Sequence, residues 1–222
     1  MKTLKLTFAS AMFATTVAFG GVTGLEPTGV FSIASAEAHG KGPQADLRLA
    51  LNQLLSEHAT LAAAATGAAL GGRNKEFEAA AGALDMNSQD IAKAIGSVYG
   101  DAAGEAFLPL WRKHIGFFVD YTMATAKGSG KGQKKAVDDL LGYAGDFAAF
   151  LNSATPALPK EAVADLVKMH ILSLKDVVDA QANRDQKLAY QKIREASHHM
   201  QMIADPLADA IAQQFPEKFP AM

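Results

Sequence analysis

Residues 51–62 read LNQLLSEHATLA and place a histidine, His58, at the centre of an apolar helical face. Wound at 3.6 residues per turn, the stretch puts leucines at 51, 54, 55 and 61 on the same side as His58. The pattern recurs at intervals of 56 residues, as FLPLWRKHIGFF around His114 and as VADLVKMHILSL around His170. A buried imidazole without a partner costs roughly 1 to 3 kcal/mol. Three buried histidines at the same position of the repeat therefore predict mutual hydrogen bonding, a shared site or a bound metal.

The 56-residue spacing extends well beyond the histidines. The positions that coincide include Leu54, Leu110 and Leu166, then Ala68, Ala124 and Ala180, then Ile91, Phe147 and Ile203. Turn-forming residues follow near the middle of each period, at 71–74, 128–132 and 183–185. Each period therefore predicts one antiparallel pair of helices.

Six helices are expected, at 44–70, 74–99, 102–127, 133–152, 158–183 and 186–214. A helix of 24 residues is about 36 Å long, which is typical of bundles. No segment alternates with period two over a useful length, so no sheet is expected. The predicted fold class is all-α, an up-down helical bundle of about six helices built from three helical hairpins.

Three hairpins can be arranged in two ways. If they close on one another, the first, third and fifth helices run the same way and bring their histidines together. If they stack in a row, they form a short solenoid whose histidines lie about 10 Å apart along a ridge. The small number of repeats and the lack of polar capping units favour closure.

The N-terminus has the pattern of an export signal. Lys2 and Lys5 precede an apolar stretch, and small residues at 34–38 offer cleavage sites after Ala36 or Ala38. We expect a signal peptide at 1–38, a short tail at 39–43 and a helical domain at 44–222, exported from the cytoplasm. The apolar stretch is short for a membrane anchor, so no stable membrane insertion is expected once the signal is removed.

Composition excludes several kinds of site. The 222 residues include 21 basic and 23 acidic side chains, which argues against a nucleic-acid partner held by bulk charge. There is no cysteine, so disulfides, thiolate zinc sites and covalent haem attachment are excluded. No nucleotide-binding, hydrolase or metalloprotease motif is present. The sequence therefore favours a binding protein over an enzyme, although it leaves catalysis undecided.

The returning helices offer further ligands. Met86 and His198 lie level with the histidines, but the helical wheel turns both away from the core. The core-facing positions near that height are 88, 144 and 200, and only Met200 among them carries a metal-binding atom. His199, on the flank of the buried stripe, can reach either way. Met200 is thus the best fourth member, with His199 as a further candidate.

Three imidazoles and one thioether form a soft to borderline ligand set. It suits copper, Cu(I) especially, and accepts zinc if the methionine withdraws. The leading hypothesis is a copper-binding protein for sequestration or delivery, with the metal held by His58, His114, His170 and Met200.

Two alternatives remain at this point. Non-covalent haem can lie between a histidine and a methionine or second histidine in a bundle, with Trp111, Phe117 and Phe118 as an apolar wall. Otherwise the protein is a ligand-free cell-surface module whose histidines form a polar layer, satisfied by Asn87, Tyr143 or a water molecule. No protein partner can be identified from the sequence.

Three segments resemble exported helical bacterial proteins labelled as copper amine oxidase N-terminal-domain-like. They are AAGEAF at 102–107, LWRKHIGFFVDYT at 110–122 and QQFP at 213–216. The resemblance implies an extracytoplasmic helical module with copper association. It does not imply oxidase activity, because the chain lacks the Asn-Tyr pair from which those enzymes make their quinone cofactor, and lacks their large β domain.

Overall fold

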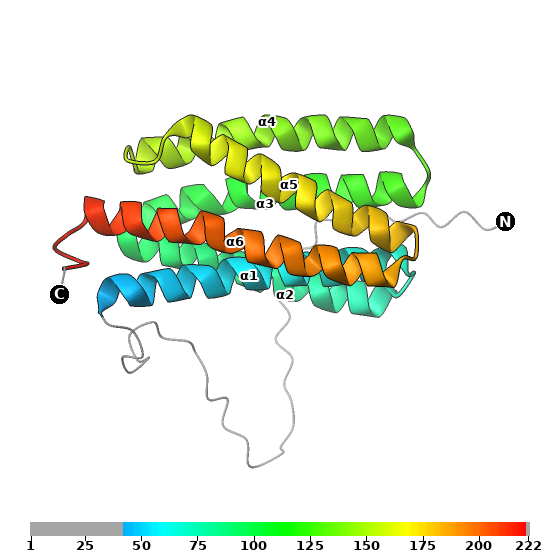
Figure 1. Cartoon of the computed structure of the whole chain (residues 1–222), viewed down its shortest axis with the longest axis horizontal. Coiled ribbons are helices and arrows are strands. Elements are labelled where there is room, and N and C mark those ends of the chain that lie inside the picture. The colour runs from blue at the N-terminus through cyan, green and yellow to red at the C-terminus, as the bar shows by residue number, and fades with distance from the viewer. Residues whose placement is uncertain (1–41, 221–222) are drawn as a thin grey trace, which may run out of the picture. The chain divides into compact units, whose positions relative to one another are not determined.

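The computed structural model describes residues 42–220, and this part of the chain forms six long helices joined by short connections (Figure 1). They are α1 (Pro43–Leu70), α2 (Asn74–Tyr99), α3 (Asp101–Ala126), α4 (Gly130–Ala154), α5 (Lys160–Ala182) and α6 (Gln186–Gln214). Residues 42–220 contain no strand, and no helix end lies more than three residues from its expected position. The all-α prediction is confirmed. The predicted signal peptide and nearly all of the predicted tail lie outside the described residues.

The three hairpin turns share one backbone geometry. Gly72, Gly128 and Arg184, which are 56 residues apart, all have positive φ angles of 67°, 63° and 58°. In each turn the next residue's amide donates to a carbonyl five residues earlier, at 2.9 to 3.0 Å; these acceptors are Ala68, Ala124 and Ala180. The three turns are thus one recurring helix stop, with a repeated alanine as acceptor and a positive φ angle at glycine in two turns and at Arg184 in the third.

The hairpins close on one another. Each helix packs against its neighbours in the chain, and α1 also packs against α6. The odd-numbered helices α1, α3 and α5 contact one another as well, so they line the interior. The stacked alternative is wrong, because a row of hairpins would leave α1 and α6 apart.

Polar side chains join α1 to α6 along the closing seam. The Asn52 Nδ2 donates to Asp205 Oδ1 at 2.7 Å, and the Gln44 Nε2 donates to Asp209 Oδ1 at 3.1 Å. Arg48 pairs with Asp209 beside them. These residues are more than 150 positions apart, so local periodicity says nothing of their pairing.

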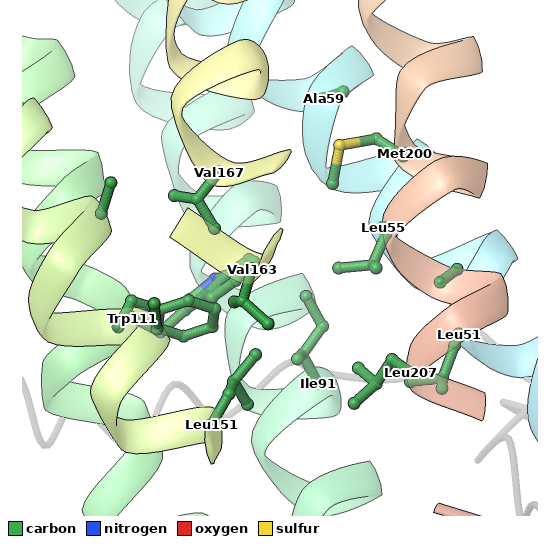
Figure 2. Packing of buried hydrophobic residues seen from close by; sticks show 14 of the residues in the cluster. Leu51, Leu55, Ala59, Ile91, Trp111, Leu151, Val163, Val167, Met200 and Leu207 are labelled. Carbon is green, nitrogen blue, oxygen red and sulfur yellow. The ribbon is translucent and has the colours of Figure 1, made fainter. Parts of the chain in front are cut away.

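The apolar faces meet in one continuous core. Leu51, Leu55, Trp111, Val163 and Val167 come from the odd-numbered helices and turn inward, as Figure 2 shows. Burial of such side chains contributes roughly 25 cal/mol per Å² of apolar surface, which is the main stabilising term for a bundle. Among the described helices, none combines the length and apolarity needed to cross a bilayer.

Candidate metal centre

The three repeated histidines converge in the middle of the bundle. His58 comes from α1, His114 from α3 and His170 from α5, and their exposed fractions are 1%, 3% and 5%. The Nε2 atoms of His58 and His114 are 3.3 Å apart. One ligand nitrogen from each of the three rings lies within 4.8 Å of the others. The closed bundle therefore gathers the rings at one point, as the helical wheel and closure together predict.

These distances are close to those of a metal site. Imidazole nitrogens bind zinc at about 2.0 to 2.1 Å, so two of them in tetrahedral geometry lie about 3.3 Å apart. The pair formed by His58 and His114 already has this spacing. One ligand nitrogen of each ring lies within 4.8 Å of the others, so a metal bound by all three requires the third nitrogen to move by on the order of 1 Å. Residues 42–220 contain no other group of three or more His, Cys, Asp or Glu side chains with this arrangement.

Most of the ring nitrogens lack hydrogen-bond partners. The Nδ1 atoms of His58 and His114 are buried and unpaired, and so are both ring nitrogens of His170. The Trp111 carbonyl approaches His114 closely enough to oppose the lowering of its pKa, but it makes no well-aligned hydrogen bond with Nδ1. Each unpaired buried donor or acceptor costs roughly 1 to 3 kcal/mol, and such groups in a native protein call for an occupant such as water or an ion.

Burial keeps all three imidazoles neutral. Desolvation, with repulsion from the other two histidines, places the pKa of His58 well below its usual range. Desolvation also lowers the pKa of His114 to about 4 and that of His170 to about 3. A neutral imidazole is the form that binds metals. The cluster therefore has its ligands in the correct protonation state at neutral pH.

Aromatic rings from the second hairpin surround the cluster. The Trp111 ring centroid lies 4.8 Å from that of His58 and 4.7 Å from that of His114, and the Tyr143 ring lies 5.1 Å from His114. The Trp111 Nε1 and the Tyr143 hydroxyl are both buried without partners. The sequence placed Trp111 beside His114 but put Tyr143 only on the flank of the returning helix. The contact of its ring with that of His114 depends on how α3 and α4 rotate against each other.

Met200 lies in the core beside the cluster. Its side chain is 1% exposed, and it lines the same interior cavity as His114 and His170. Figure 2 shows it projecting from α6 near Leu55. Met86 and His198, which the helical wheel turns outward, are exposed. The choice of Met200 over them is thus consistent with its position.

His199 lies outside the group of three. It is half-buried, and its Nε2 donates to the Leu166 carbonyl at 3.0 Å. Asn87, its counterpart in the first hairpin, donates in the same way to the Leu54 carbonyl at 3.0 Å. Both side chains therefore brace a hairpin by joining its two helices. Because Nε2 of His199 is engaged with the Leu166 carbonyl, only Nδ1 of His199 is left to bind a metal.

Comparison with protein-family models, with curated proteins and with solved structures gives no match for this chain. The resemblance to proteins labelled copper amine oxidase N-terminal-domain-like therefore stays a prediction. A helical bundle serves many unrelated functions, so the chemistry of the site, and not the fold, bears on what this protein does.

Proposed function

We propose that this protein binds a transition metal through His58, His114 and His170, and that the preferred ion is copper as Cu(I). The observation that carries the proposal is the convergence of three buried imidazoles, from three different helices, with ligand nitrogens within 4.8 Å of one another. Rigid helices place these donors before any ion arrives, so binding needs little reorganisation.

The charge of the surroundings favours a singly charged ion. Within residues 42–220 no carboxylate belongs to the cluster, and the neighbouring side chains are apolar or aromatic. Burying a doubly charged ion without an anion costs far more than burying a singly charged one. Cu(I) is also the softer ion, and the thioether of Met200 is a soft donor within the same core. Zinc would need hydroxide or another anion at its open position.

The two alternatives have less support. The cavity beside the cluster has a volume of about 50 Å³. Sites for drug-sized ligands occupy about 300 to 1,000 Å³, and haem belongs to that size class. A ligand-free polar layer would pair its nitrogens with protein groups or with water, and no protein group pairs with either ring nitrogen of His170.

The burial of the site supports a role in storage or transfer of the metal over a role in catalysis. The cluster has no buried carboxylate to act as a general base, and the metal would be shielded from bulk solvent. We therefore propose sequestration or delivery, outside the cytoplasm if the N-terminal export signal functions as its sequence predicts.

Direct titration with Cu(I) under anaerobic conditions, and separately with Zn(II), tests the proposal. We expect one Cu(I) per chain, bound more tightly than Zn(II). Loss of an outer partner of a metal ligand typically weakens binding 10- to 100-fold, so His114→Ala should weaken Cu(I) binding by at least about 100-fold. Exposed His198 supplies the matched control, because His198→Ala should leave the affinity unchanged. Absence of stoichiometric binding, or binding insensitive to His114→Ala, would refute the proposal.

A further inference from the structure

A small interior cavity adjoins the histidine cluster. Its volume is about 50 Å³, and His114, His170 and Met200 form part of its wall. The remaining wall comes from aliphatic and aromatic side chains of all six helices. All of the lining residues are buried except Ile203, which is half-buried. The cavity therefore lies inside the bundle, between the histidines and the end where α1 begins.

The cavity wall suits an apolar occupant. A buried water molecule needs two to four polar partners, whereas this wall is almost entirely carbon. The nitrogens and oxygens of the lining residues are covered by neighbouring side chains and do not face the space. Apolar cavities of this kind stay dry and bind uncharged apolar molecules.

The volume limits the size of that molecule. An engineered apolar cavity of about 150 Å³ holds benzene or xenon. The cavity described here has about a third of that volume, which excludes a six-membered ring. A single atom of a heavy noble gas or a molecule of two or three heavy atoms fits.

We propose that this cavity binds one small uncharged molecule of the size and polarity of dioxygen or carbon monoxide, next to the metal. Two of the three imidazoles border the cavity, so an occupant lies beside the proposed ligands. A metal held by three protein ligands keeps a fourth coordination position open. The imidazoles turn carbon toward the cavity in the metal-free protein, so that position faces the cavity only after the rings rotate to bind the ion. The placement beside a metal rests on the proposed function, whereas binding of a small apolar molecule by the cavity does not.

Val167 offers a substitution that fills the cavity without touching a ligand. It lines the cavity from α5, and the residues at the same register in the other two hairpins are Leu55 and Trp111. Because this register already accepts larger side chains, Val167→Leu and Val167→Phe should reduce the cavity in two steps. Val119→Leu is the matched control, because Val119 is half-buried in α3 and does not line the cavity.

The first experiment uses metal-free protein under xenon pressure, followed by methyl NMR. We expect saturable shifts confined to the methyl groups around the cavity. Val167→Phe should weaken xenon binding at least tenfold and Val167→Leu severalfold, with Val119→Leu unchanged. Should Val167→Phe fail to fold, the weakening by Val167→Leu supports the proposal. Unsaturable shifts, or xenon binding equal in all folded variants, would overturn it whether or not copper binds.

The second experiment adds carbon monoxide to the anaerobic Cu(I)-loaded protein and follows the C–O stretching band. We expect Val167→Phe, or Val167→Leu to a smaller extent, to weaken carbon monoxide binding at unchanged Cu(I) affinity. Equal carbon monoxide affinity in all variants would overturn the placement of the molecule beside the metal. Saturable xenon binding without any copper binding would support the cavity site and refute the proposed metal function instead.

Discussion

At the residue scale, the buried histidines make the protein sensitive to acid. Unfolded histidine titrates near pH 6.5, whereas burial lowers the pKa of His114 to about 4. Above pH 6.5 the imidazole is neutral in both the folded and the unfolded state, so the free energy of unfolding does not depend on pH through His114. As the pH falls from 6.5 toward 4, the unfolded state takes up a proton that the folded state does not, so stability is lost.

His114→Leu should remove this acid sensitivity at one position. Between pH 7.5 and pH 4.5, the metal-free protein should lose about 2 to 3 kcal/mol of unfolding free energy through His114, and the variant should lose that much less. Urea denaturation at the two pH values measures the difference. The exposed His198, changed to leucine, is the comparison. Equal acid sensitivity in His114→Leu and the unchanged protein would count against a neutral buried imidazole.

At the element scale, one turn breaks the rule that the other two follow. Gly72 and Gly128 occupy the left-handed region without penalty, but Arg184 has a φ of 58° there. A non-glycine residue in this region destabilises the folded state by roughly 1 to 2 kcal/mol. Replacing it with glycine recovers only part of this free energy, because glycine loses more conformational entropy on folding. The third turn therefore holds a local strain that the first two lack.

Arg184→Gly should relieve that strain and raise the unfolding free energy by about 0.5 to 1 kcal/mol. The reverse exchange at the equivalent position, Gly128→Ala, should lower it by a similar amount. Chemical denaturation of both variants at one pH provides the test. Destabilisation by Arg184→Gly would mean that the arginine side chain makes a contribution larger than its backbone strain.

The elements also show what sequence alone can predict. The helix ends followed from turn residues and from apolar periodicity, and the direction of the histidines followed from the helical wheel. The pairing of α1 with α6 could not be predicted in this way, because the hydrogen bond between Asn52 and Asp205 joins residues 153 positions apart. The contact of Tyr143 with His114 and the volume of the cavity also escaped prediction. Both depend on side-chain packing between helices, which has no periodic signature.

At the scale of the whole molecule, closure turns a repeated pattern into one site. The same three histidines on a row of stacked hairpins would form separate polar spots, whereas contact between α1 and α6 brings them together. The cluster is then a buried group in which most ring nitrogens have no protein hydrogen-bond partner. Any ion bound there should stabilise all six helices at once.

Thermal unfolding tests this coupling between site and bundle. A ligand that binds only the folded state at 100 times its dissociation constant adds about 2.7 kcal/mol, which for a domain of this size raises the Tm by about 5 to 10 °C. We expect that rise when Cu(I) is added to the unchanged protein. The combined change His58→Leu, His114→Leu and His170→Leu should abolish it.

The metal-free triple variant should be at least as stable as the metal-free parent, because leucine fills similar space without leaving unpaired nitrogens. Its stability does not discriminate between a metal site and a ligand-free polar layer, because both predict it. The copper-induced rise does discriminate, since a polar layer has no differential affinity for the ion and cannot couple it to folding. An equal rise in parent and triple variant would place the copper elsewhere on the chain, and no rise in the parent would argue for the polar layer.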